Sequence, residues 1–215
     1  MPSIETLITF FGVAVLLGLS PGPDNLFVLV QSAQRGWRVG LCVVLGLCLG
    51  IVGHTAAVAL GLAALVAASP MLFTVIKLCG AAYLLYMAWG AWNAPVAVEE
   101  TAKAQTERDV LTFQAALKWA GRGVVMNLTN PKVLIFFLAF LPQFADPARG
   151  SVGLQVMVLG CVFMLATLLV FGSIACGSGL FGQILQRSVR AQRWLNRIAA
   201  TVFGALALRL VMVQR

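Results

Sequence analysis

The chain has 215 residues, of which 60% are hydrophobic and 10% are charged. Soluble domains are roughly half apolar and a quarter charged, and one soluble core of this length would not bury so much apolar surface. The formal net charge of +8 is compatible with nucleic-acid binding, but the basic residues lie between apolar segments and share no polar face. The composition therefore excludes a soluble nucleic-acid-binding protein and predicts an all-α integral membrane protein surrounded by a lipid bilayer.

Six apolar segments follow one another along the chain. Each has at least about the 20 residues that an α-helix needs to cross a bilayer, and the second contains no Lys, Arg, Asp or Glu. The six segments cover residues 6–30, 39–68, 71–92, 124–144, 153–181 and 194–213. The sequence thus predicts six transmembrane helices.

A polar linker divides these segments into two groups of three. Residues 94–112 contain four of the seven acidic residues of the chain, so we place this linker outside the membrane. We expect one three-helix repeat in residues 1–93 and a second in residues 113–215. Because each repeat has an odd number of spans, the two would cross the bilayer in opposite directions, as in transporters built from inverted repeats.

Basic residues indicate the direction of insertion. Alternate loops carry Arg35, Arg38, Lys103, Arg108, Lys118, Arg122, Arg187, Arg190, Arg193 and Arg197. The opposite side carries Arg149 and Arg215. Because basic loops remain in the cytoplasm, the pattern predicts a cytoplasmic linker and both termini outside the cytoplasm.

The stretch "SPGPDN" at residues 20–25 interrupts the first apolar segment. Pro21 and Pro23 have no amide proton and cannot continue a helix, and Gly22 supplies conformational freedom between them. Pro23 is suited to begin a second half-helix. Asp24 is then a carboxylate inside a span, which is costly unless it pairs or has a function.

A counterpart, "NLTNPK" at residues 127–132, interrupts the fourth segment. A shift of 108 positions places Pro23 on Pro131 and Asp24 on Lys132. Backbone groups that are freed at membrane depth are tolerated only inside protein or along a wet cavity. The first and fourth spans are therefore predicted to be broken at their prolines, with a polar site between them.

The polar groups at these two breaks complement a zwitterion. Amides at the start of a half-helix favour an anionic group such as a carboxylate. Asp24 could attract an ammonium group or carry a proton, while Lys132 could hold a carboxylate or pair with Asp24. Substrate binding and a purely structural ion pair both remain open at this stage.

His54, the single histidine, lies near the middle of the second segment. Gly46, Gly50 and His54 are spaced by four residues and share one helical face, on which glycine allows close helix packing. A histidine there suits either a proton relay or a neutral side chain that is hydrogen-bonded to a neighbouring helix. The glycine faces also make a homodimer possible.

The sequence shows no catalytic, metal-binding or cofactor-binding constellation. Five cysteines lie in apolar segments without metal-ligand spacing, and no phosphate-binding loop of the G-x-x-x-x-G-K-[ST] type occurs. We therefore expect no metal, no cofactor and no enzymatic activity. An ion gradient is then the expected energy source for uphill transport.

The motifs resemble those of the LysE/RhtB family of amino-acid exporters over nearly the full length. The resemblance rests on "SPGPDN" at 20–25, "GWRVGLCVVLGLCLG" at 36–50, "GAAYLLYMAWG" at 80–90 and "NLTNPKVLIFFLAFLPQF" at 127–144. It implies export of a zwitterionic amino acid or close derivative across the bacterial inner membrane, driven by proton antiport. The first alternative is a passive channel or facilitator, and the second is an intramembrane enzyme.

Two sets of residues follow as predictions. The substrate or coupling site comprises Asp24, Asn25, Lys132, Asn130, Thr129 and His54. The helix breaks comprise Ser20, Pro21, Gly22, Pro23, Asn127 and Pro131.

Overall fold

A computed structural model of the chain describes residues 1–20, 22–68, 70–93, 111–177 and 189–212. Within these ranges the ordered elements are all helical and no strand occurs. The long helices are α1 (Ile4–Leu19), α2 (Pro23–Arg35), α3 (Trp37–Ala68), α4 (Pro70–Trp92), α5 (Phe113–Thr129), α7 (Val152–Gly177) and α9 (Val189–Met212). The short ones are α6 (Pro131–Ile135), the π-helix η1 (Phe136–Phe140), and the 3-10 turns η2 (Leu141–Phe144) and η3 (Pro147–Arg149). Outside the described residues lie Pro21, Arg187, Arg215 and positions 94–110 of the predicted linker.

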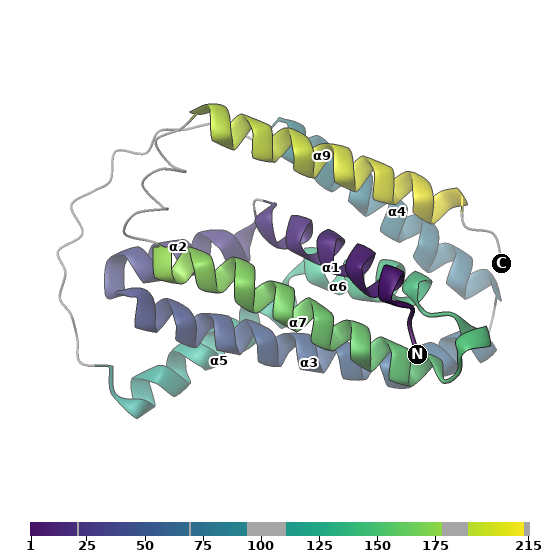
Figure 1. The fold of residues 1–215 in the computed structure, drawn as a ribbon, viewed down its shortest axis with the longest axis horizontal. Helices are drawn as coiled ribbons and strands as arrows, with labels where there is room; N and C mark the ends of the chain where they lie inside the picture. Colours follow the sequence, from purple (N-terminus) through teal and green to yellow (C-terminus); the bar gives the residue numbers. More distant parts are fainter. Residues whose placement is uncertain (21, 69, 94–110, 178–188, 213–215) are drawn as a thin grey trace.

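Apart from the bends at the two breaks, the long helices run roughly along one common axis, some in one sense and some in the other (Figure 1). α3 packs against α5 and α7, and α1 also packs against α7. α4 and α9 pack mainly against each other and form a separate layer, which contacts the remaining helices through η1, α3 and α1. α3 thus lies in the middle of the larger layer, between helices from the two halves of the chain.

Two helices are continuous, apolar and long enough to cross a membrane. They are Trp37–Gly61 within α3 and Val152–Gly177, which is α7. Two further apolar pairs are bent at short breaks, α1 with α2 by 63° and α5 with Pro131–Phe144 by 53°. If each bent pair counts as one span, the described residues contain four spans, and both predicted helix breaks are present.

Many large apolar side chains lie on the outside of the described helices, whereas several polar ones are buried. Large apolar residues such as Ile4, Leu60 and Phe113 are more than three-quarters exposed, whereas Asp24 and Lys132 are buried. Lipid favours apolar side chains on the outside and requires polar ones to face the bundle interior. The prediction of an all-helical membrane protein agrees with this distribution.

Several helix boundaries lie outside the predicted spans, and the start of the fourth span differs most. The fourth span was expected to begin at residue 124, but α5 begins at Phe113. Lys118 and Arg122 lie within the helix as exposed residues, while Trp119 between them is buried. A span predicted from hydropathy stops at the first charged residues. The helix itself can continue through them, because long basic side chains extend their charged groups to the interface.

Glycines bring α3 and α5 into backbone contact. A Cβ at Gly46 would overlap the carbonyl group of Ala120, and a Cβ at Gly123 would overlap the carbonyl group of Val43. Such close approach is typical of small residues between membrane helices. The glycine face that made a homodimer possible is therefore used inside the protomer, and it gives no support to a dimer.

We expect Gly123→Ala to lower the free energy of unfolding by about 1–3 kcal/mol, because the added methyl group overpacks this contact. The matched control is Gly121→Ala on the same helix, where a Cβ would meet no atom within 4 Å. Thermal unfolding of the detergent-purified variants measures the difference. Equal melting temperatures for the two variants would contradict the packing that is described for α3 and α5.

Candidate functional site

The first break separates α1 from α2 with extended backbone. Ser20 ends α1 with φ −66° and ψ 136°, and Gly22 has φ −172° and ψ 172° before α2 starts at Pro23. Residues before proline avoid helical geometry, which explains the position of this break. Extended backbone does not itself require glycine, in contrast to our expectation for Gly22. The reason for glycine here is space, since a Cβ would lie 3.0 Å from Nζ of Lys132.

The second break separates α5 from α6 in a similar way. Asn130 is extended, with φ −74° and ψ 110°, and Pro131 is the first residue of α6. Oδ1 of Asn130 accepts a hydrogen bond of 2.9 Å from the backbone N–H of Lys132, so it caps the new helix. The π-helix η1 follows directly, a rare conformation that is frequent near functional sites.

Lys132 connects the second break to the first. Its ammonium group donates to the carbonyl oxygen of Leu17 at 3.0 Å and to both the carbonyl and the hydroxyl oxygen of Ser20 at 3.1 Å. These acceptors lie at the carboxyl end of α1, where the helix dipole favours a cation. An ammonium group has three protons, so the end of α1 uses all of its donors in this conformation.

Asp24 lies close to Lys132 without forming an ion pair with it. The two charges interact electrostatically, but no nitrogen–oxygen distance between them is within 4 Å. Oδ1 of Asp24 and Oδ1 of Asn127 are buried without a hydrogen-bond partner, and Nδ2 of Asn130 faces the Asp24 carboxylate without forming a hydrogen bond of ordinary geometry. Buried polar atoms are rarely left unpartnered unless they serve a function or hold water. These three atoms therefore mark the part of the site that can receive a polar ligand.

A small cavity lies between the two breaks. Its walls include Asp24, Asn127, Lys132 and apolar residues from α1, α3 and α7, and its volume is about 10 Å³. This is room for about one water molecule. The cavity is therefore too small for an amino acid, which can bind there only after a rearrangement.

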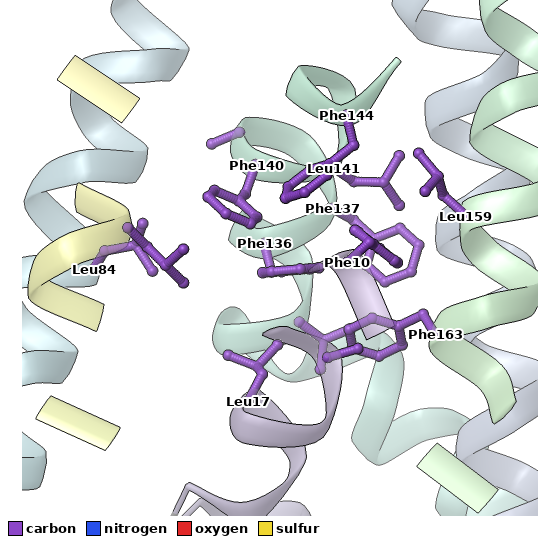
Figure 2. Close-up of a cluster of buried hydrophobic side chains, with 14 of the residues drawn as sticks. Phe10, Leu17, Leu84, Phe136, Phe137, Phe140, Leu141, Phe144, Leu159 and Phe163 are labelled. Atoms are coloured by element: carbon purple, nitrogen blue, oxygen red, sulfur yellow. The ribbon is translucent and has the colours of Figure 1, made fainter. Parts of the chain in front are cut away.

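An aromatic cluster adjoins the cavity and closes one side of it. Phe163 of α7 lines the cavity and packs edge-on against Phe137 with ring centroids 5.1 Å apart. Phe136 and Phe10 extend the cluster toward the start of α1 (Figure 2). The cluster therefore supports an apolar wall of the cavity at Phe163.

His54 binds the backbone at the second break. Its Nε2 donates to the carbonyl oxygen of Asn127 at 3.2 Å, and its ring lies 5.5 Å from that of Phe137. Gly50, one turn earlier, makes room for Asn127, since a Cβ there would lie 2.6 Å from its Oδ1. This hydrogen bond is the one expected if His54 has a structural role. A role of His54 in proton transfer stays a proposal.

Of the other predicted site residues, Asn25 lies at the first break and Thr129 lies outside the site. Nδ2 of Asn25 donates to the carbonyl oxygen of Gly18 at 2.6 Å, so it stabilises the first break. Thr129 is exposed, and its hydroxyl donates to Val125 of its own helix at 2.8 Å. The structure therefore does not bring Thr129 to the cavity, and we leave it out of the proposed site.

Sequence reasoning missed the role of Ser20 and the presence of Thr167 at the site. Ser20 was assigned only to the helix break, but its carbonyl and hydroxyl oxygens bind Lys132. Thr167 of α7 lines the cavity and lies in a long uncharged segment. No sequence signal marks the face of such a helix until its neighbours are known.

The described residues hold no cluster of three or more His, Cys, Asp or Glu side chains that could bind a metal ion. The five cysteines are unbonded, and three of them are exposed on the outer surface. The site thus consists of one carboxylate, one ammonium group, amide side chains and backbone carbonyl groups. Such groups can bind and move a charged solute.

The fold and the site define a helical membrane protein with a buried polar site between two broken helices. Its sequence matches the family model described as LysE type translocator over residues 15–214. The chain therefore belongs to this family, which confirms the resemblance that its motifs indicated. It is a membrane transport protein and not an enzyme.

Three relatives illustrate the similarity. The chain is 40% identical over 196 residues to an uncharacterized membrane protein of Pseudomonas aeruginosa, with 89% of this chain and 83% of that protein covered. It is 30% identical over 173 residues to the homoserine/homoserine lactone efflux protein of Salmonella typhimurium, with 80% of each covered. It is 27% identical over 206 residues to the leucine efflux protein of Salmonella typhimurium, with 96% and 94% covered. No solved structure matches the chain.

We expect Lys132→Met to lower the free energy of unfolding by about 3 kcal/mol, because it leaves the carbonyl oxygen of Ser20 without a donor and the buried Asp24 without a nearby cation. Lys118→Met is the matched control, since Lys118 is exposed on α5. Thermal unfolding in detergent provides the comparison. The assignment of Lys132 to the end of α1 would be wrong if both variants melted at the same temperature.

Proposed function

We propose that this protein exports an amino acid or a close derivative across the bacterial inner membrane by secondary active transport, with a proton moving inward in exchange. The observation that carries the proposal is the buried, unpartnered carboxylate oxygen of Asp24 beside a pair of broken helices. An intramembrane carboxylate of this kind marks an ion or substrate path. The efflux proteins among the relatives support an amino acid or derivative as the cargo.

The proposed architecture has six spans in two inverted repeats, residues 1–93 and 113–215, joined by a cytoplasmic linker at 94–112. In this scheme α4 and α9 are the third and sixth spans. Helices in corresponding positions run in opposite directions (Figure 1): α1 against α5, α3 against α7, and α4 against α9. The packing is also paired, because α3 contacts α5 as α1 contacts α7. Both features support inverted repeats.

In the proposed site, Asp24 binds either the ammonium group of the substrate or the coupling proton. Lys132 neutralises the buried charge of Asp24 and holds the end of α1 in place. Asn25 and Asn130 fix the two breaks, and Asn130 also presents Nδ2 beside Asp24. His54 binds the backbone of the second break and relays protons when the site opens.

Transport requires at least two conformations of this site. The cavity of about 10 Å³ is closed to a solute as large as an amino acid, which argues against a permanently open channel. Alternating access by rocking of one repeat against the other is the usual solution for inverted repeats. The breaks at Pro23 and Pro131 are the points at which the half-helices can change their angle.

We expect cells that carry this protein to release one or more preloaded amino acids faster than empty cells, and Asp24→Asn to abolish that release. Efflux of each common amino acid is followed with the proton gradient intact and collapsed. Glu5→Gln, the same chemical change at an exposed acid of α1, serves as the control. Release that persists without a gradient would favour a passive facilitator, and normal release by Asp24→Asn would refute the proposed site.

The orientation has its own test. We expect a periplasm-active phosphatase fused after the last residue to be active, and a fluorescent protein at the same place to stay dark. A fluorescent protein inserted after residue 100 should fluoresce, because the basic loops keep the linker in the cytoplasm. The reverse pattern would show that the termini face the cytoplasm.

A further inference from the structure

The α2 helix turns its polar side into the protein and its apolar side outward. Asp24 and Ser32 are 3% and 2% exposed, whereas Leu26 and Val30 are 63% and 41% exposed. With 3.6 residues per turn, Asp24, Ser32 and Arg35 lie on one face of the helix. A helix with lipid on one side and a polar path on the other is expected to have this pattern.

Ser32 carries a buried hydroxyl group that the fold leaves unused. Serine and threonine in helices commonly bond the carbonyl group four residues earlier, as Ser173 does with Leu169 at 2.6 Å. Oγ of Ser32 makes no such bond and is buried without a partner. It points at α3, where a Cβ on Gly40 would overlap it. Oε1 of Gln31 on the same side of α2 is also buried and unpartnered.

Two guanidinium groups lie over one indole ring at the end of this face. Arg35 of α2 lies 5.1 Å and Arg122 of α5 lies 4.3 Å from the ring centroid of Trp119. The ring itself is 8% exposed and packs against Phe27 of α2 at 6.4 Å. In the part of the chain that the structure describes, neither guanidinium has a carboxylate within 4 Å. Two cations that share a ring and have no counter-ion among the described residues are suited to bind an anionic group.

These groups follow a line toward the site described above. Arg35 is 11 residues from Asp24, about 16 Å along a helix axis, and Ser32 and Gln31 lie between them. Val28, which is fully buried, fills the same face one turn after Asp24. The apolar packing at Val28 therefore separates the outer polar groups from Asp24 in the closed conformation.

We infer that the inward face of α2 is the cytoplasmic wall of the path to Asp24, and that Arg35 and Arg122 on Trp119 bind the substrate carboxylate at its mouth. The identity of the cargo and the cytoplasmic side of the mouth rest on the proposed function, but the existence of a path along this face does not. The head group of an anionic lipid has related chemistry, and the experiments separate the two sources.

The path is tested by thiol labelling, which needs no transport activity. Ser32→Cys and Leu26→Cys are made in a variant without the five native cysteines, and inside-out vesicles are treated with a charged, membrane-impermeant maleimide. We expect Ser32→Cys to be labelled at least tenfold faster than Leu26→Cys, because the inward face meets water when the site opens, whereas Leu26 faces lipid. Equal rates, or no labelling of Ser32→Cys while Arg38→Cys is labelled, would overturn the path.

The carboxylate site is tested by kinetics in proteoliposomes, with leucine and homoserine as the first substrates. We expect Arg35→Gln and Arg122→Gln each to raise KM on the cytoplasmic face about tenfold, with the maximal rate changed less than twofold. Arg38→Gln is the control, because Arg38 also lies over a tryptophan, Trp37, at 5.4 Å but on α3. An equal change in all three variants would overturn the assignment.

Two further outcomes separate this inference from its alternatives. If the effect of Arg35→Gln disappears in vesicles without phosphatidylglycerol, the site binds a lipid head group and the carboxylate assignment is wrong. If the wild-type protein moves no amino acid, the proposed function fails. Labelling of Ser32→Cys would then still establish the path. If Ser32→Cys is not labelled, the path is wrong as well.

Discussion

Backbone groups that are freed inside a membrane need partners from within the protein, and this constraint organises the whole site. Each helix break leaves carbonyl groups that lipid cannot satisfy. At the end of α1 the donors are Lys132 for Leu17 and Ser20, and Asn25 for Gly18. At the end of α5 the donor from another helix is His54. Lys132 belongs to the second half of the chain and His54 to the first, so each half completes a break in the other.

The packing around the breaks follows from the same environment. Lipid is as apolar as the side chains it touches, so close packing has to hold membrane helices together without a hydrophobic driving force. Glycines on α3 and α5 allow backbone contact, and these contacts fix the height at which His54 meets α5. On the other side of the cavity the aromatic cluster holds η1 against α1 and α7. Both regions position the polar groups more rigidly than loops would.

Much of this arrangement was predictable from the sequence, because its signals are local. Proline and the residue before it determine a break whatever surrounds them, and the breaks lie at Pro23 and Pro131 as predicted. The direction in which a side chain faces could not be predicted in the same way, because it depends on the neighbouring helices. Thr129 and Asn130 are adjacent in sequence, but one is exposed and the other buried. The acceptors of Lys132 are mostly backbone oxygen atoms, which every residue has and no pattern reveals.

The unequal surroundings of Asp24 and Lys132 bear on how coupling would work. All three protons of Lys132 are engaged, so its charge is held in place, whereas one oxygen of Asp24 has no partner. A proton and a substrate ammonium group would compete for this oxygen, and a single carboxylate cannot satisfy both at once. Under the proposed function, such mutually exclusive binding links export of the substrate to import of the proton. A ligand shifts a conformational equilibrium only by its differential affinity. Coupling therefore requires that the proton and the substrate each stabilise a different opening of the breaks beside Asp24.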